Sequence, residues 1–167
     1  MMKRGILITK MAKKINIGCG WNHKYGFINI DKAEEVKPDM VYDIENGLLP
    51  FKNDSVEHIY SSHCLEHVKP CNWQFVLDEI MRVAKNGCIL ELELPFDNSK
   101  KRGNIGHYRT FYFSSFSQYY VTEKKRAYYS DWKLKKLHRE PAFIEKVIYT
   151  LFPIIKPNIK FKFEVIK

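Results

Sequence analysis

Short apolar runs separated by polar loops constrain the fold of this chain more than any other feature. Five such runs occur in the first 95 residues, at Lys14–Ile17, Gly26–Ile30, Met40–Asp43, Val56–Tyr60 and Cys88–Leu94. An apolar run of this length bounded by loop residues predicts a β-strand. Strands that alternate with loops and a helix are typical of an α/β domain with a largely parallel sheet.

One amphipathic helix is predicted within residues 72–85. Its apolar side chains recur at helical spacing, and charged residues fill the opposite face; the apolar positions are Trp73, Val76, Leu77, Ile80, Met81 and Ala84. Asn72 is predicted to cap the start of the helix, and Gly87 is predicted to follow its end. The helix would lead directly into the fifth strand.

Two further strands are predicted near the C-terminus, at Trp132–Arg139 and Ile159–Ile166, with a helical segment at Pro141–Phe152 between them. The strand at Cys88–Leu94 is unusual because Glu91 and Glu93 alternate with leucines. A parallel strand covered on both faces is normally almost entirely apolar. One face of this strand is therefore expected to be thinly covered or paired with lysines.

Length and composition indicate one compact domain, since the 167 residues are 45% hydrophobic. We expect a single domain at residues 13–167 after an N-terminal extension at residues 1–12. No apolar run of about 18 residues is present, so no membrane span is expected. The cysteines, four in number, are scattered along the chain, which is typical of reduced thiols in a cytoplasmic protein.

The chain is strongly basic, with a formal net charge of +9. A positive field raises the local concentration of anions, so nucleic acid, anionic lipid or an acidic small molecule could be a partner. Ordinary solubility explains the same charge equally well.

A glycine-rich turn, Gly18-Cys19-Gly20, follows the first predicted strand, and Asp31 ends the second. Glycine lets the backbone approach a ligand closely because no Cβ intervenes. A carboxylate at the end of the second strand can accept hydrogen bonds from both hydroxyls of a ribose. Together these features predict a cofactor that contains a nucleoside. The alternatives are a simple turn at the glycines and a helix cap at Asp31.

Dinucleotide and triphosphate binding are disfavoured. The dinucleotide pattern requires a third glycine, which here is His23, and an acid about 20 residues further on, whereas Asp31 follows Gly20 by eleven. No amphipathic helix fits between Gly20 and Asp31. The chain also lacks the Gly-Lys-Ser/Thr of a phosphate-binding loop.

The chain resembles the class I S-adenosylmethionine-dependent methyltransferases, in particular small members of the type-11 kind. The resemblance lies in INIGCG, GFINID, YDIENGLLPFKNDSVEHIYSSHCLEHV, HYRTF and the closing FKFEVIK, and it covers roughly residues 13–167. It implies a Rossmann-like three-layer sandwich with reduced helix cover. The sheet would be mostly parallel, with an antiparallel last strand.

The resemblance also implies which residues of the glycine-rich turn would bind S-adenosylmethionine. Gly18, Cys19 and Gly20 would pass beneath the methionine and ribose parts of the cofactor. Asp31 would hold the ribose hydroxyls. The segment between Gly20 and Asp31 is shorter than in larger members, which carry a full helix there, so cover over one face of the sheet would shrink.

Further cofactor contacts are implied at the ends of the third and fourth strands. Asp43 would place its carboxylate near the exocyclic amine of adenine, and the backbone amide of Ile44 would lie near a ring nitrogen. Ser61, Ser62 and His63 would lie near the sulfonium.

Methyl transfer needs a general base only if the acceptor must lose a proton. His63 and His107 are the predicted catalytic residues, because histidine titrates near neutral pH; Glu66, His67 and Arg109 lie in the same two motifs. The alternative for His63 is a role in shaping the cofactor site.

The cluster of His63, Cys64, Glu66, His67 and Cys71 contains residue types that bind metals. A zinc site usually needs three or four converging ligands. Only His63 and His67 share a face at four-residue spacing. No metal is therefore expected.

The acceptor pocket is predicted to include Tyr108, Arg109 and Phe111. Their alternative role is packing at the edge of the sheet. A small molecule or glycan precursor is the favoured acceptor, and the alternatives are nucleic acid, a non-catalytic cofactor-binding subunit and a nucleotide-sugar or NAD enzyme. The oligomeric state is not predicted.

Overall fold

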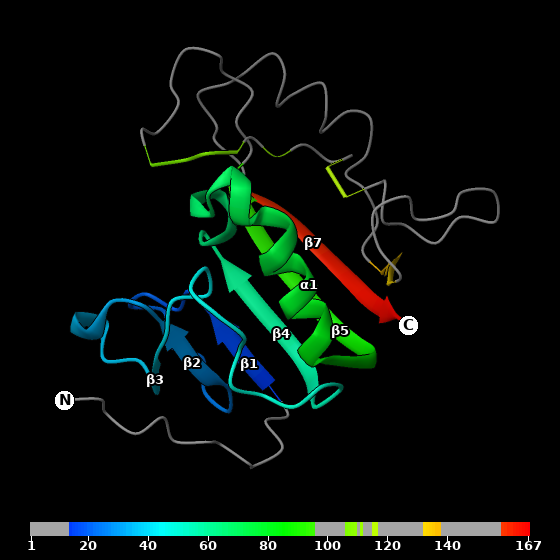
Figure 1. Cartoon of the computed structure of the whole chain (residues 1–167), viewed down its shortest axis with the longest axis horizontal. Coiled ribbons are helices and arrows are strands. Elements are labelled where there is room, and N and C mark those ends of the chain that lie inside the picture. The colour runs from blue at the N-terminus through cyan, green and yellow to red at the C-terminus, as the bar shows by residue number, and fades with distance from the viewer. Residues whose placement is uncertain (1–13, 96–105, 110, 112–114, 117–131, 138–157) are drawn as a thin grey trace.

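The computed structural model describes residues 14–95, 106–109, 111, 115–116, 132–137 and 158–167, and these form a single sheet flanked by one α-helix (Figure 1). The predicted extension at residues 1–12 and the predicted helix at Pro141–Phe152 lie outside the described residues. No helix in the described part of the chain is long and apolar enough to cross a membrane.

The sheet has seven strands in the order β3-β2-β1-β4-β5-β7-β6. The strands are β1 (Lys14–Ile17), β2 (Ile28–Asp31), β3 (Met40–Val41), β4 (Val56–Ser62), β5 (Ala84–Pro95), β6 (Lys133–Lys136) and β7 (Asn158–Ile166). Strands β1 to β5 pair in parallel, whereas β7 runs antiparallel to both β5 and β6. The predicted α/β class and the mostly parallel sheet are confirmed.

All seven predicted strands are present; the first has the predicted bounds, and the bounds of the others differ. The second begins at Ile28 rather than Gly26, because Gly26 has a φ of +77° and belongs to the preceding turn. The third ends at Val41, ahead of the turn at Asp43. The fifth is longer than predicted, since it begins at Ala84, directly after the helix.

The core lies between the sheet and α1 (Trp73–Val83). Alternate residues of the longer strands are buried in this core, among them Ile15, Ile59, Leu90 and Phe163, which are all almost fully buried. Ile59 pairs with Leu90, and Leu90 pairs with Phe163, so the apolar side chains form continuous rows across the strands. Figure 1 shows α1 lying across β4 and β5.

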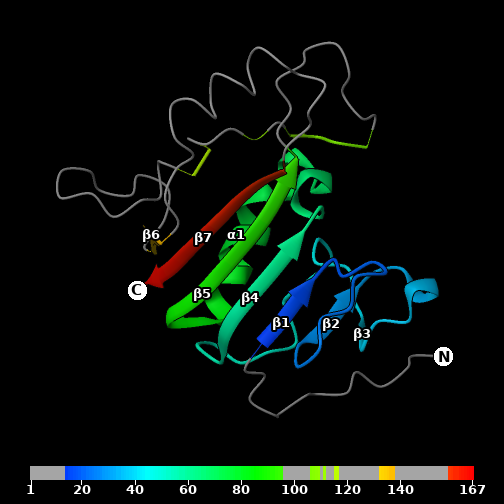
Figure 2. The same ribbon diagram turned by 180° about the vertical axis from the view of Figure 1, so that it is seen from behind.

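The opposite face of the sheet is polar, and none of the described α-helical residues covers it (Figure 2). Lys162 Nζ lies 2.7 Å from Glu91 Oε1, and Lys160 Nζ lies 3.8 Å from a carboxylate oxygen of Glu93. The hydrogen bond and charge of Lys162 outweigh the effect of burial and lower the pKa of Glu91. The alternation of leucine and glutamate in β5 thus reflects one apolar face and one face paired with lysines, and the predicted reduction in helix cover is confirmed.

The predicted start of the helix is confirmed, since Asn72 directly precedes α1 as its N-cap residue, but the predicted capping hydrogen bond and the predicted end of the helix are wrong. The Asn72 side chain makes no capping hydrogen bond; its amide instead donates to Glu45 Oε2 at 2.8 Å, which joins the loop after β3 to the start of α1. The helix ends at Val83, and Ala84 is already extended. Gly87, with a φ of +80°, lies inside β5 and not at the helix end.

Candidate functional site

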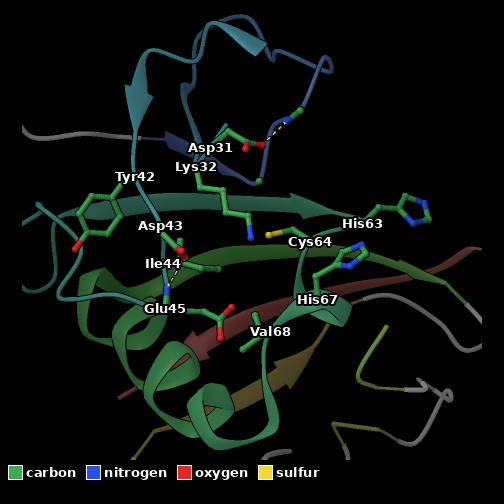
Figure 3. A pocket seen from close by; sticks show the side chains of 12 residues that line it. Asp31, Lys32, Tyr42, Asp43, Ile44, Glu45, His63, Cys64, His67 and Val68 are labelled. Atoms are coloured by element: carbon green, nitrogen blue, oxygen red, sulfur yellow. Dashed lines mark hydrogen bonds between the residues drawn. The ribbon is translucent and has the colours of Figure 1, made fainter. Parts of the chain in front are cut away.

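A pocket of about 340 Å³ lies at the carboxyl ends of β1, β2 and β4 (Figure 3). This is the edge where open α/β sheets bind ligands. Six of the residues implied as cofactor contacts line it: Gly18, Gly20, Asp31, Asp43, Ile44 and His63. The structure therefore brings together residues that are up to 45 positions apart in the sequence.

The two glycines of the turn have different surroundings. A Cβ on Gly18 would lie 2.3 Å from Cys64 Sγ, so Gly18 is required for the close packing of the β1 turn against the β4 turn. A Cβ on Gly20 would meet no atom within 4 Å. Gly20 therefore leaves open space at the pocket wall, and both residues have positive φ angles that favour glycine.

Asp31 holds the glycine-rich turn in place. Its Oδ2 accepts a hydrogen bond from the Gly20 backbone N–H at 2.8 Å, and its Oδ1 accepts one from Ala33 N–H at 2.9 Å. A carboxylate offers about four acceptor positions. The hydrogen bonds among the described residues thus use two of these positions.

Two buried asparagines, Asn16 and Asn29, hold the short segment that replaces a helix between β1 and β2. Asn16 Nδ2 donates to Asn29 Oδ1 at 2.9 Å, and the backbone N–H of Lys24 donates to the same oxygen at 2.7 Å. Asp39 in turn accepts hydrogen bonds from both the backbone and the side chain of Asn29. We had not predicted this network, although polar residues inside two apolar runs were a visible signal for it.

The loop after β3 forms the wall opposite Asp31. Asp43 Oδ1 accepts a hydrogen bond from Glu45 N–H at 3.0 Å, so this carboxylate shapes the turn as well as lining the pocket. Ile44 is half-buried against the core and supplies an apolar surface. The pocket walls include four residues that the sequence analysis does not name, Lys32, Tyr42, Glu45 and Val68. They also include Cys64 and His67, which the sequence analysis names only as candidates for a metal site or for catalysis.

Three implied cofactor residues do not line the pocket: Cys19, Ser61 and Ser62. Cys19 is only 4% exposed, and its backbone N–H continues the β1–β2 pairing by donating to Ile30 O at 3.0 Å. Burial and the nearby Asp31 raise the pKa of its thiol. Ser61 is buried on the face of the sheet that packs on α1, and Ser62 pairs with Glu93.

Cys64 lies in the turn after β4, where this turn packs against the glycine-rich turn after β1. Burial, with the charges of Glu66 and Asp31, raises the pKa of its thiol to about 12. The thiol is therefore protonated at neutral pH and serves as a neutral packing partner of Gly18. All four cysteines are free, as expected for reduced thiols.

His63 begins the turn after β4 with a φ of +51°, a left-handed conformation that is uncommon outside glycine. Its backbone N–H donates to Glu93 O at 2.9 Å, which keeps it joined to β5. Its ring is half exposed, and Nδ1 lies 3.3 Å from Glu66 Oε1. The turn continues into a short 3-10 helix, η2 (Leu65–His67).

The segment at residues 106–109 lies against η2. The Tyr108 backbone N–H donates to Glu66 O at 2.8 Å, and His67 Nδ1 lies 2.7 Å from Gly106 O. The rings of His67 and His107 meet edge to face at 4.8 Å. His107, predicted as a catalytic candidate, is thus brought beside Glu66 and His67 at the pocket margin.

The three residues predicted to bind the acceptor have different environments, and none of them lines this pocket. Tyr108 is 52% exposed, so its ring is accessible. The Arg109 guanidinium lies over the Trp73 ring at 4.3 Å. Phe111 is only 2% exposed and stacks with Phe116, so it is a core residue in this structure.

The strand order and the position of the pocket are those of a class I S-adenosylmethionine-dependent methyltransferase fold. Residues 5–92, just over half of the chain, match the family model described as "Methyltransferase domain", of the type-11 kind. The chain belongs to this family, and the resemblance inferred from its motifs is confirmed. No curated protein sequence matches it significantly.

Solved structures support the same fold. An S-adenosylmethionine-dependent methyltransferase from Archaeoglobus fulgidus aligns with a TM-score of 0.59 at 17% identity, over 92% of this chain and 85% of that one. A 1,6-didemethyltoxoflavin-N1-methyltransferase from Burkholderia thailandensis, solved with its substrate and S-adenosylhomocysteine, also gives 0.59, at 9% identity over 92% and 71% of the two chains. A Mesorhizobium loti methyltransferase gives 0.52 at 13% identity, over 93% and 90%.

Several other solved structures match over a smaller share of their own length. The chain spans 43–51% of three of them, with TM-scores of 0.39–0.43. The three structures named above have TM-scores above 0.5 and are all below 25% identical to this chain, so they establish the fold alone.

Proposed function

We propose that this protein binds S-adenosylmethionine in the pocket between Gly20, Asp31 and Ile44 and transfers its methyl group to a small acceptor. The observation that carries the proposal is the convergence of an open glycine turn and a strand-ending carboxylate on one cavity. Family membership supports the choice of cofactor.

In this proposal the ribose hydroxyls donate to the two acceptor positions of Asp31 that the hydrogen bonds among the described residues do not use. The adenine lies between Asp43 and Ile44, where a carboxylate and an apolar side chain share the wall. Gly20 lets the methionine part pass close to the backbone. The half-exposed ring of His63 borders the opposite side of the pocket, near the place assigned to the sulfonium.

The chemistry is an in-line displacement. A lone pair on the acceptor attacks the methyl carbon, the carbon–sulfur bond breaks, and its electron pair stays on sulfur, which leaves as S-adenosylhomocysteine. The protein mainly supplies position, because the sulfonium already activates the methyl group. Where the acceptor is a hydroxyl, His63 is the proposed base that receives its proton.

Calorimetric titration of S-adenosylhomocysteine tests cofactor binding. We expect a dissociation constant in the micromolar range, on the order of −7 to −8 kcal/mol. Asp31→Asn should weaken binding at least tenfold, because the ribose loses charge-assisted hydrogen bonds. Unchanged affinity in Asp31→Asn would remove this carboxylate from the site.

Asp54→Asn is the matched control. Asp54 lies just before β4, at the other end of the sheet, and pairs with Lys167. The same loss of charge there should leave the affinity for S-adenosylhomocysteine unchanged. A loss in both variants would indicate a general electrostatic effect in place of a contact.

The acceptor class is proposed from the size of the cavity. About 340 Å³ is in the range of small-molecule sites and leaves little volume beside a nucleoside cofactor. Turnover of a small acceptor should change little between 50 and 200 mM salt. A steep loss of affinity for RNA or DNA over the same range would indicate a nucleic-acid acceptor.

Two broader features belong to the same proposal. One sheet contains strands from residue 14 to residue 166, which supports a single domain at residues 13–167. Four free thiols are consistent with a reducing, cytoplasmic location.

A further inference from the structure

The turn after β4 and the segment at residues 106–109 bring three ligand-type side chains together. One donor atom from each of Glu66, His67 and His107 lies within 4.8 Å of the other two. The residues come from two segments about 40 positions apart, so the cluster is a product of the fold and not of one local motif. Two imidazoles and one carboxylate form a ligand set that divalent transition metals prefer.

Glu66 is the central observation. It is 0% exposed, and neither carboxylate oxygen accepts a hydrogen bond from any group in the described part of the chain. A buried carboxylate without a partner is costly, and it normally pairs with a cation or binds a metal. His63 Nδ1 lies 3.3 Å from Glu66 Oε1.

His67 is oriented as a metal-binding histidine. Gly106 O is a carbonyl and can only accept, so the proton of the neutral His67 ring is on Nδ1, which donates to this oxygen at 2.7 Å. The lone pair is then on Nε2. Histidines that bind metals commonly donate their other ring N–H to a backbone carbonyl in this way.

We propose that Glu66, His67 and His107 form a binding site for a divalent transition metal of the zinc type, at the margin of the pocket. Ligand atoms about 2.1 Å from a tetrahedral ion are roughly 3.4 Å apart. Side-chain rotations that move each donor atom by about 1 Å would therefore bring the three atoms to this spacing. Three protein ligands would leave a fourth position for a water molecule or another ligand. The site departs from the expectation, drawn from the sequence, that no metal is bound.

The position of the ion beside the pocket suggests its role in the proposed reaction. An open coordination position beside the cofactor pocket would take an oxygen or nitrogen of the acceptor and lower the pKa of a bound hydroxyl. Metal binding itself does not depend on the proposed methyl transfer. The two proposals therefore fail separately, since zinc can be titrated without any cofactor.

The test uses Zn²⁺ alone with the full chain. We expect binding of one equivalent by calorimetry, and a melting temperature that rises by about 5–10 °C at a hundredfold excess over the dissociation constant. Glu66→Gln and His107→Gln should each weaken zinc binding at least tenfold. Two control variants, Cys71→Ser and His23→Gln, remove an exposed thiol and a histidine outside the cluster and should leave it unchanged.

A second readout separates a ligand from a structural residue. Without metal, Glu66→Gln should melt at or above the temperature of the wild type, because it removes a buried carboxylate that accepts no hydrogen bond from the described residues, and it should not be stabilised by zinc. The proposal is overturned if no stoichiometric zinc binds at millimolar concentration. It is equally overturned if zinc binds Glu66→Gln and His107→Gln as tightly as the wild type, or if only Cys71→Ser abolishes binding.

Discussion

The two sides of the pocket differ in how their polar groups are satisfied. On the side built by β1 and β2, Asp31, Asn16 and Asn29 are all tied into hydrogen bonds with the chain itself. On the side built by the turn after β4, the Glu66 carboxylate is buried without a hydrogen bond from any described residue. In the two proposals above, the first side is preformed for the cofactor, and the second gains its partner from a metal ion.

A polar wall whose groups are all hydrogen-bonded and one whose carboxylate accepts no hydrogen bond are suited to different ligands. A preformed wall binds a ligand without reorganising, which lowers the cost of binding. An unpaired buried charge costs stability until a partner arrives. The four predictions below test the two sides separately.

The largest effect is expected at Gly18. Gly18→Ala should lower the free energy of unfolding by about 3 kcal/mol, because its Cβ would collide with Cys64 and its φ of +65° is strained for alanine. Gly20→Ala should cost only about 1 kcal/mol, since its Cβ meets no atom of the chain. Urea denaturation of both variants measures the difference. Equal losses would contradict the distinct roles of the two glycines.

The next effect is expected at Asn29. Asn29→Ala should lower the free energy of unfolding by about 2 kcal/mol, because Lys24 N–H and the Asp39 carboxylate lose their buried partner. It should also weaken S-adenosylhomocysteine binding, since the turn that carries Gly20 is no longer held. A stable variant with unchanged affinity would show that the asparagine network does not preform this wall.

Glu66→Gln should have the opposite sign. On the metal-free protein we expect the free energy of unfolding to stay the same or rise by about 1 kcal/mol, because the substitution removes a buried charge with little change in shape. The same urea experiment compares it with Asn29→Ala. A loss of 2 kcal/mol or more in Glu66→Gln would mean that this carboxylate is satisfied in the folded chain, and the contrast between the two sides would fail.

The smallest effect concerns the pH dependence of Cys64. With a pKa raised to about 12, its thiolate fraction at pH 8 is about 1 in 10,000 and increases tenfold with each unit of pH. Iodoacetamide at pH 8 should therefore label the exposed Cys71 well before Cys64, and labelling of Cys64 should accelerate towards pH 10. Mass spectrometry of tryptic peptides measures both rates. Fast labelling of Cys64 at pH 8 would contradict the raised pKa of its thiol.

Much of the fold could be predicted because each strand carries a local signal. Leucine and glutamate alternate in β5, and this period-2 pattern specifies both the strand and its lysine-paired face. The start of α1 could be predicted in the same way, but the contact of its N-cap residue and the end of the helix could not. Asn72 has the chemistry of a cap, but a tertiary hydrogen bond to Glu45 determines where its side chain points. Gly87 follows the periodic residues, but the chain leaves the helix at Val83 to enter the sheet.

The candidate site also contains residues whose positions could be predicted from the sequence and residues whose positions could not. The glycine turn and Asp31 are adjacent to strand ends, so sheet topology alone brings them together. The approach of His107 to Glu66 depends on how a distant segment folds back onto η2, and no local pattern encodes that contact. The burial of Phe111 likewise depends on Phe116 and Trp73, which the sequence does not place beside it.

A crystal structure of the protein with S-adenosylhomocysteine tests the central claim most directly. The account predicts both ribose hydroxyl oxygens within about 2.5–3.0 Å of the Asp31 carboxylate, with the adenine against Ile44. A nucleoside found in another part of the molecule, or one whose ribose points away from Asp31, would contradict it.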